Sequence, residues 1–310
     1  NECHSQPKVF QKPAVRSMIL YPMNALVNDQ LGRLRLLFGD NRLKAKSIEL
    51  SNRPIRFGRY TGRTPYPGIR SENSEKVRLK SIGGFYIKIA QEAQTNPEAR
   101  QLMEELKRIG KWPSKDMLNW YGQGRWTDNQ GNFIRCNTLN NDVELFTRHE
   151  IQRNPPDLLV TNYHMLEYML IRPIEKSIFD SSKEWWKENP EQKFLLILDE
   201  AHLYNGPVGA EVSLLIRRFT SRLGISPSRL QIICSTASFS DPNVAKQFSA
   251  ELTGTEVENF VTITGDMKYK TEIREAGSEE LEILCKIDLE RLQKDTTRET
   301  WENELKDLFD

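Results

Sequence analysis

Long hydrophobic runs are absent from this chain of 310 residues. No segment approaches the roughly 18 consecutive apolar residues that a membrane-spanning helix requires. The N-terminus also lacks the basic stretch and apolar stretch of a secretory signal. The first residue is Asn1 rather than methionine, so we expect a fragment or a processed form whose missing motifs lie upstream. These absences together favour a cytoplasmic protein that makes no membrane contact.

Cysteine is scarce, and no pair of cysteines has metal-ligand spacing. Cys3, Cys136, Cys234 and Cys285 are scattered, without a C-x-x-C pair or a histidine at ligand spacing. We therefore expect reduced structural thiols and no zinc site.

An excess of charge of either sign is missing too. The chain has 44 basic and 43 acidic residues, for a net charge of +1. Composition therefore gives no electrostatic sign of a nucleic-acid protein, and any such binding must be local. The hydrophobic content of 38% is enough for the packed core of one large domain or two modest ones.

Short apolar runs alternate with longer helical patterns along the chain. Helical spacing is clearest from about Asn24 to Phe38 and between Gly206 and Gly224. Several apolar runs lack polar alternation, which is typical of strands that are buried on both faces. The expected strands are Ser17 to Leu20, Pro54 to Tyr60, Leu158 to Thr161, Phe194 to Leu198 and Leu230 to Ser235. The pattern predicts an α/β fold in which helices sandwich a parallel sheet.

Residues 69–150 interrupt this pattern and predict an inserted helical and irregular subdomain. Residues 1–68 and 151–265 would form the main lobe, and residues 266–310 a charged helical tail. The inserted aromatics Trp112, Trp120 and Trp126 could stack nucleic-acid bases. They could also form a small accessory core, which we favour because a small subdomain needs large residues to bury apolar surface.

The strongest chemical signal is an apolar strand that ends in Asp199-Glu200-Ala201-His202. Ligands of open α/β folds bind at the carboxyl ends of parallel strands. In P-loop NTPases an aspartate at such a strand end holds Mg²⁺. The adjacent Glu200 can polarise an attacking water. Alternatively, the two carboxylates cap the following helix.

Four further segments follow expected strands, in an order that resembles a known family. They are Pro22-Met23-Asn24-Ala25-Leu26, Tyr60-Thr61-Gly62, Thr161-Asn162-Tyr163 and Ser235-Thr236-Ala237-Ser238. With Asp199-Glu200-Ala201-His202 as motif II, they resemble motifs Ia to III in the first RecA-like lobe of superfamily 2 DEAD/DEAH-box helicases. The resemblance covers about Met18 to Gly265. Within the superfamily, the chain is most similar to large bacterial DNA-repair and phage-defence helicases, including DISARM and Druantia-like ones.

The resemblance implies a RecA-like fold, with ATP and Mg²⁺ as cofactors. It also implies DNA as a partner, with RNA possible, and other defence or repair subunits. Asp199 would hold Mg²⁺ through water, and Thr236 and Ser238 would bond to the motif II carboxylate or His202, coupling hydrolysis to strand movement. The catalytic set is then Asp199, Glu200, His202, Thr236 and Ser238.

The remaining motif residues would bind the nucleic-acid backbone. Thr161 and Asn162 can cap a helix that starts near Tyr163, leaving N–H groups that favour a phosphate. Similar turns are capped in many α/β proteins with no nucleic acid nearby. Met23 and Asn24 depart from the usual Thr-Arg of motif Ia, which leaves a backbone contact there but puts a side-chain contact in doubt. The expected binding set is Pro22, Asn24, Thr61, Gly62, Thr161, Asn162 and Tyr163.

A P-loop, Gly-x-x-x-x-Gly-Lys-Ser/Thr, is missing, and Gly83-Gly84 lacks the following Lys-Ser/Thr. The chain alone should therefore hydrolyse ATP poorly or not at all. One interpretation is a fragment of an ATP-dependent helicase or translocase acting on DNA, with a P-loop upstream and a second lobe beyond residues 266–310. The other is a helicase-derived nucleic-acid-binding or scaffolding subunit without ATPase activity. Retention of both Asp199 and Glu200 favours the first.

Overall fold

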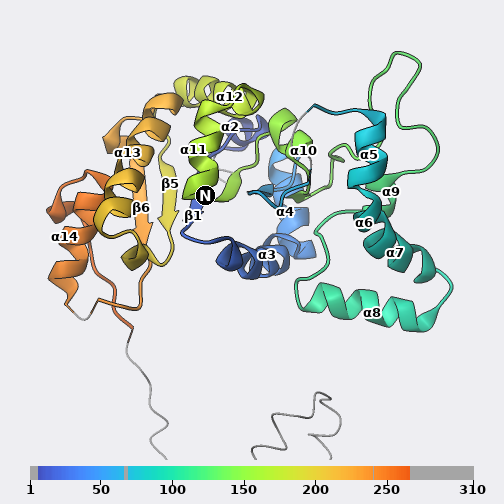
Figure 1. Ribbon diagram of the computed structural model, residues 1–310, viewed down its shortest axis with the longest axis horizontal. Coiled ribbons are helices and arrows are strands. Elements are labelled where there is room, and N and C mark those ends of the chain that lie inside the picture. The colour runs from blue at the N-terminus through green and yellow to red at the C-terminus, as the bar shows by residue number, and fades with distance from the viewer. Residues whose placement is uncertain (1–5, 66–68, 240, 266–310) are drawn as a thin grey trace, which may run out of the picture. The chain divides into compact units, whose positions relative to one another are not determined.

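The structure is a computed structural model that describes residues 6–65, 69–239 and 241–265. Its described part contains a sheet of six parallel strands in the order β3-β2-β4-β1-β5-β6. The strands are β1 (Ser17–Tyr21), β2 (Phe57–Tyr60), β3 (Glu144–Leu145), β4 (Leu158–Asn162), β5 (Phe194–Leu198) and β6 (Leu230–Cys234). Helices flank this sheet (Figure 1), which confirms the RecA-like α/β fold.

Alternate side chains of β1 enter two different cores, because successive residues of a strand point to opposite faces. Met18 and Leu20 belong to the larger core, and Ile19 and Tyr21 to the smaller one. The smaller core is closed by α3 (Asn24–Phe38). The larger core is closed by α11 (Tyr163–Ile171), α12 (Lys176–Glu188), α13 (Gly206–Leu223) and α14 (Pro242–Thr253). The central strand is therefore buried on both faces, as its apolar run predicts.

Strand β6 is different, because it lies at the edge of the sheet. Its residues are alternately intermediate and exposed, and Ile233 is 47% exposed. The expectation that apolar runs mark strands buried on both faces is therefore wrong for β6. An edge strand has a neighbour on one side only, so an apolar sequence does not guarantee full burial.

Several element boundaries agree with the sequence, and others differ. Helix α3 occupies the expected range, and α13 ends at Gly224 in the left-handed conformation with φ +69°. The second strand begins at Phe57 rather than Pro54, since the backbone N–H of Arg56 already donates to the Asp157 side chain. Strand β3 was not expected and is only two residues long.

The segment between β2 and β3 has a core of its own. Trp112, Trp120 and Trp126 are 6%, 1% and 5% exposed, which confirms the accessory-core interpretation over a base-stacking platform. Its helical elements are α5 (Glu72–Arg78), α6 (Lys80–Ile82), the π-helix η1 (Gly83–Ile87), α7 (Lys88–Glu92), α8 (Pro97–Arg108) and α9 (Met117–Tyr121). Helix α10 (Arg148–Arg153) leads from β3 back towards β4.

Shorter elements complete the described chain. They are α2 (Pro7–Gln11), α4 (Asn41–Ser51), η2 (Pro173–Glu175), η3 (Ala201–Leu203), η4 (Pro227–Arg229) and η5 (Val257–Asn259). Helix α4 packs against α2 and α3. The expected tail at residues 266–310 lies outside the described residues.

The described cysteines are isolated thiols. Cys136 is buried and Cys234 partly buried, while Cys3 and Cys285 fall outside the described ranges. Burial raises the pKa of the Cys136 thiol to about 12, which keeps it in the unreactive protonated form. No three His, Cys, Asp or Glu side chains of residues 6–65, 69–239 and 241–265 group as a metal site. None of the helices described there is long and apolar enough to cross a membrane.

Candidate functional site

All five motif segments lie at one edge of the sheet. Each follows the carboxyl end of a different parallel strand, and parallel strands place these ends together. The strand order also sorts the segments. Those after β2, β4 and β1, expected to bind nucleic acid, are neighbours on one side. Those after β5 and β6, expected to be catalytic, are neighbours on the other.

Asp199 is tied to the strand beside it. The hydroxyl of Ser235 donates to Oδ1 of Asp199, and the backbone N–H of Ala201 donates to the carbonyl oxygen of Ser235 at 2.9 Å. On its other side, Asp199 donates its backbone N–H to Leu20 at 3.2 Å. Ser235 is therefore the hydroxyl partner of the carboxylate. Sequence reasoning assigned that part to Thr236 and Ser238 and missed Ser235, although the hydroxyl directly after strand β6 was a visible signal.

Glu200 and His202 form a second connection with β6. Glu200 has a left-handed backbone with φ +49°, which is uncommon for a residue with a side chain. Nδ1 of His202 lies 3.4 Å from Oε2 of Glu200 and 3.1 Å from Oγ1 of Thr236. The expected contact between Thr236 and His202 is therefore present. Ser238 donates its backbone N–H to Oγ1 of Thr236 at 3.2 Å.

The structure does not support the alternative that Asp199 and Glu200 cap a helix. Neither η3 nor α13 has a side-chain cap, and the residue that precedes α13 is Asn205. The side chain of Asn205 donates to the carbonyl oxygen of His202 at 3.0 Å. Both carboxylates are consequently available at the sheet edge, where they are only partly buried.

Two buried tyrosines, Tyr21 and Tyr204, lie near enough to Asp199 to be affected by its charge. The hydroxyl of Tyr204 donates to the carbonyl oxygen of Leu20 at 3.2 Å. Burial, and then the negative charge of Asp199, raise the pKa of Tyr204 and that of Tyr21 well above the ordinary value. Both hydroxyls therefore stay protonated and can act as hydrogen-bond donors.

Asn162 links the ends of β4 and β1. Its side-chain oxygen accepts from the N–H of Met165 at 2.8 Å, capping α11 as expected. Its side-chain nitrogen donates to the side-chain oxygen of Asn24 at 2.7 Å. Thr161 does not cap the helix, since its buried hydroxyl donates to the carbonyl oxygen of Tyr60 at 2.7 Å instead.

The junction after β1 also differs from its expected form. Helix α3 begins at Asn24, and the preceding Met23 provides no side-chain cap. Pro22 and Asn24 therefore do not reproduce the capped turn that Asn162 makes. Tyr163 begins α11 and is partly buried, with its ring centroid 6.2 Å from that of Tyr204.

Thr61 and Gly62 form a closed turn after β2. The N–H of Thr61 donates to Oγ1 of Thr64 at 2.9 Å, and this hydroxyl donates to the carbonyl oxygen of Arg59 at 2.7 Å. The N–H of Thr64 returns to the carbonyl oxygen of Thr61 at 3.1 Å. Thr61 is buried, whereas Gly62 is exposed, with no heavy atom within 4 Å of an added Cβ. A ligand can therefore reach the backbone of Gly62.

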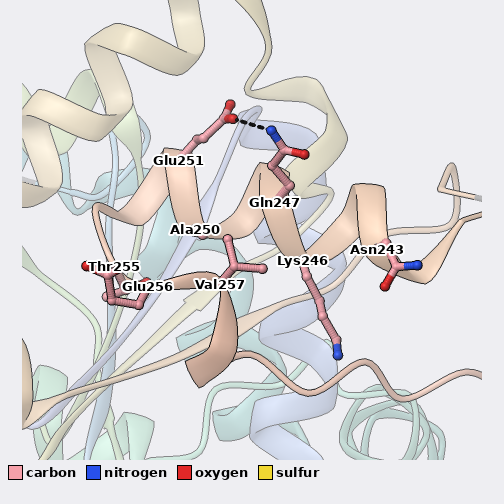
Figure 2. Close-up of a pocket in the computed structure, with 8 residues that line it drawn as sticks. All are labelled: Asn243, Lys246, Gln247, Ala250, Glu251, Thr255, Glu256 and Val257. Atoms are coloured by element: carbon pink, nitrogen blue, oxygen red, sulfur yellow. Dashed lines mark hydrogen bonds between the residues drawn. The ribbon is translucent and has the colours of Figure 1, made fainter.

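Two cavities lie away from this edge. One of about 410 Å³ lies beside α14 and includes Lys246 in its wall, together with Glu251, which accepts from Gln247 at 3.0 Å (Figure 2). The other, of about 820 Å³, is lined by parts of the inserted segment and α10. No expected site residue lines either of them. The candidate site at the sheet edge is therefore separate from both of these cavities.

The parallel sheet, its flanking helices and the carboxylates at its edge define a RecA-like α/β lobe. No family model matches the chain. Over 314 aligned residues the chain is 43% identical to Druantia protein DruE of Escherichia coli (strain UMEA 4076-1), covering 94% of this chain and 16% of DruE. This chain is therefore similar to DruE over nearly its whole length.

A more distant relative is named as a helicase. The uncharacterized ATP-dependent helicase MJ1574 of Methanocaldococcus jannaschii is 28% identical over 109 residues, which is 35% of this chain and 15% of that protein. The chain thus spans about a sixth of the length of these curated relatives. The crystal structure of DUF1998 helicase MrfA matches 78% of this chain and 22% of its own, at 17% identity and a TM-score of 0.35.

Proposed function

We propose that this chain is the first RecA-like lobe of an ATP-dependent helicase or translocase that acts on DNA. The observation that carries the proposal is the pair of side-chain contacts between the residues that follow β5 and those that follow β6. Ser235 donates to Asp199, and Thr236 contacts His202 at 3.1 Å. A displacement of Asp199 or His202 would therefore move Ser235 and Thr236 at the end of β6 through these contacts.

Asp199, Glu200 and His202 would form the hydrolytic half of the edge. The described residues hold no group of three His, Cys, Asp or Glu side chains that could bind a metal, so an ion beside Asp199 would need further ligands from elsewhere. This fits Mg²⁺, which is commonly held by one or two carboxylates together with water and phosphate oxygens. Asp199 would hold the ion through water. When bound with ATP, Mg²⁺ neutralises negative charge on the phosphates. Glu200, which is partly exposed, would orient the attacking water.

The ends of β2, β4 and β1 would form the nucleic-acid half. Gly62 offers an accessible backbone, while Asn162 and Asn24 join two strand ends through one hydrogen bond. Contacts to the phosphate backbone carry no sequence information, as a motor that moves over any sequence requires. Pro22, Thr61, Thr161 and Tyr163 belong to this half, with Thr61 and Thr161 buried beneath the surface.

Other elements that an ATP-dependent helicase needs would come from outside this sequence. A phosphate-binding P-loop does not occur in the 310 residues, and the chain spans 16% of DruE. We infer that the P-loop and a second RecA-like lobe are supplied by other segments of the parent protein, with residues 69–150 as an insertion. The similarity to Druantia protein DruE supports a defence setting with other defence or repair subunits.

Stimulation of ATP hydrolysis by nucleic acid tests the proposed substrate. The full-length parent protein would be assayed with no polymer, with single- and double-stranded DNA, and with RNA of matched length. We expect DNA to stimulate hydrolysis. Stimulation by RNA alone would contradict the proposed substrate. A folded parent that binds DNA but hydrolyses no ATP would instead support a helicase-derived scaffold.

A further inference from the structure

Arg148 reaches from the far end of the inserted segment to the turn where that segment begins. It is the first residue of α10, which a capping box of Thr147 and Glu150 fixes in place. Its backbone N–H donates to the carbonyl oxygen of Pro65 at 3.0 Å. Its guanidinium Nη2 donates to the carbonyl oxygen of Thr61 at 2.8 Å. One residue thus contacts both sides of the Thr61 turn from a position 87 residues away in sequence.

A buried shell holds the Arg148 side chain. Arg148 is 3% exposed, and its guanidinium carbon lies 5.0 Å from the ring centroid of Tyr60. Nη1 of Arg148 is 4.0 Å from Oε1 of Glu175, which also accepts from the hydroxyl of Tyr60 at 2.9 Å. Arg172 approaches the same carboxylate oxygen at 3.4 Å but is 36% exposed. The shell therefore leaves the guanidinium little freedom to move.

This arrangement is costly if Arg148 serves only to fill space. Nε and Nη1 of Arg148 are buried and make no hydrogen bond within the described chain. Burial also lowers the pKa of Arg148, because desolvation disfavours the charged form. A buried ion pair can often be replaced as a whole by apolar residues without loss of stability. The directed bond to Thr61 is what an apolar residue could not provide.

The carbonyl of Thr61 and the N–H of Gly62 belong to the same peptide group. Because a peptide group is planar and trans, its carbonyl and its N–H point in opposite directions. A bond that draws the Thr61 carbonyl inwards to Arg148 therefore aims the Gly62 N–H outwards. Gly62 is exposed, and its N–H has no hydrogen-bond partner among the described residues.

We propose that Arg148 is a positioning residue that fixes the Thr61–Gly62 peptide so that the Gly62 N–H donates to a nucleic-acid phosphate. Arg148 itself touches no nucleic acid in this account. The inference rests on the proposed function, since it needs a nucleic-acid strand at this edge. It gives the end of the inserted segment an indirect part in binding, through the Thr61–Gly62 peptide.

The experiment compares Arg148→Met and Arg148→Lys with Arg172→Met in the full-length parent protein. Arg172→Met is the matched control, because Arg172 shares Glu175 but does not contact Thr61. Fluorescence anisotropy would give the Kd for a single-stranded DNA oligonucleotide of mixed sequence at several salt concentrations. Thermal unfolding would be recorded for each variant.

We expect Arg148→Met to raise the Kd about three- to tenfold, the effect of losing about one hydrogen bond. The slope of log Kd against log salt should stay unchanged, because the lost contact is made by an uncharged N–H group and releases no counterion. Arg148→Lys keeps a donor but lacks the planar guanidinium, so its Kd should lie between those of the unmodified protein and Arg148→Met. Arg172→Met should leave both the Kd and the slope unchanged. If Arg148→Met does not fold, the lysine variant carries the test with a rise of about twofold.

An Arg148 variant that unfolds at lower temperature but binds DNA with the unmodified Kd would overturn the positioning role alone. An equal loss of affinity in Arg172→Met would also overturn it, since the effect would then come from Glu175 and the surrounding packing. Failure of the unmodified parent to bind any DNA or RNA would instead overturn the proposed function and this inference together.

Discussion

The side-chain nitrogen of Asn162 donates a hydrogen bond of 2.7 Å to the side-chain oxygen of Asn24. This bond joins the ends of the neighbouring strands β4 and β1. The side-chain oxygen of Asn162 caps α11 at the same time, through the N–H of Met165. One side chain therefore carries two separable roles, a helix cap and a link between two motifs.

These two roles predict different costs for the two asparagines. Asn162→Ala removes the cap and the link, and we expect it to lower the free energy of unfolding by about 1–2 kcal/mol. Asn24→Ala removes the link alone and should cost no more than about 1 kcal/mol. Urea denaturation of both variants measures the difference. Equal costs would show that the cap contributes nothing to stability.

Asp157 holds the opposite end of the sheet together. It accepts from Arg16, from Arg53 at 2.6 and 2.8 Å and from the N–H of Arg56 at 2.9 Å, and it is 4% exposed. Asp157→Ala leaves buried arginines without their carboxylate, so we expect a loss of about 3–5 kcal/mol in the free energy of unfolding.

Glu188→Ala is the control for this substitution. It breaks the exposed pair of Glu188 with Lys12, which should cost about 1 kcal/mol or less. Chemical denaturation of the two variants side by side gives the comparison. Similar losses in the free energy of unfolding for Asp157→Ala and Glu188→Ala would mean that the buried ion pairs of Asp157 stabilise the fold no more than an exposed pair does.

Two glycines predict opposite responses to an added methyl group. Gly110 has φ +69°, and a Cβ there would lie 2.4 Å from the carbonyl oxygen of Gly32 in α3. We expect Gly110→Ala to destabilise the protein by roughly 2 kcal/mol or more. Gly62→Ala meets no atom within 4 Å, so its effect should stay within about 0.5 kcal/mol. Thermal unfolding distinguishes the two, and a neutral Gly110→Ala would contradict the close approach.

His149 predicts a loss of stability in mild acid. Burial, followed by the charges of Arg70 and Arg78, lowers the pKa of His149 from 6.5 to about 4. The unfolded state then binds a proton more readily than the folded state between these two values. Stability should therefore fall as the pH drops from 6.5 towards 4.

The size of this effect follows from the two pKa values. Between pH 7 and pH 5 the contribution of His149 should amount to about 2 kcal/mol. Urea denaturation at both values, with His149→Gln as the comparison, measures it. Because glutamine does not titrate, the variant should lose less stability over this interval. Identical losses in both proteins would contradict a depressed pKa at His149.

The sequence was sufficient for the parallel sheet and for the edge where the motifs meet. The apolar runs of β1, β4 and β5 are continuous, and each is followed by a motif, so their shared edge follows from parallel topology alone. Strand β3 could not be found in this way. Two residues carry no periodicity, and Glu144 at its start is a buried carboxylate that pairs with Arg35 at 2.7 Å.

The hydrogen-bond partners at the site could be predicted less well than its location. Local spacing allowed Thr161, Asn162, Thr236 and Ser238 several roles, and only the packing of neighbouring strands selects among them. Thr161 bonds to Tyr60, which is 101 residues away in sequence. The role of Arg148 could not be predicted for the same reason, since nothing near it in the sequence indicates that its side chain reaches Thr61.

ATP hydrolysis by the full-length parent and its Glu200→Gln variant tests the central claim most directly. Glu211→Gln is the matched control, because Glu211 is exposed on α13. We predict hydrolysis that DNA stimulates in the unmodified protein and in Glu211→Gln, with a loss of at least about a hundredfold in Glu200→Gln, the scale of a lost general base. Unchanged hydrolysis in Glu200→Gln, or none in a folded parent that binds DNA, would contradict the assignment of this edge as the motor site.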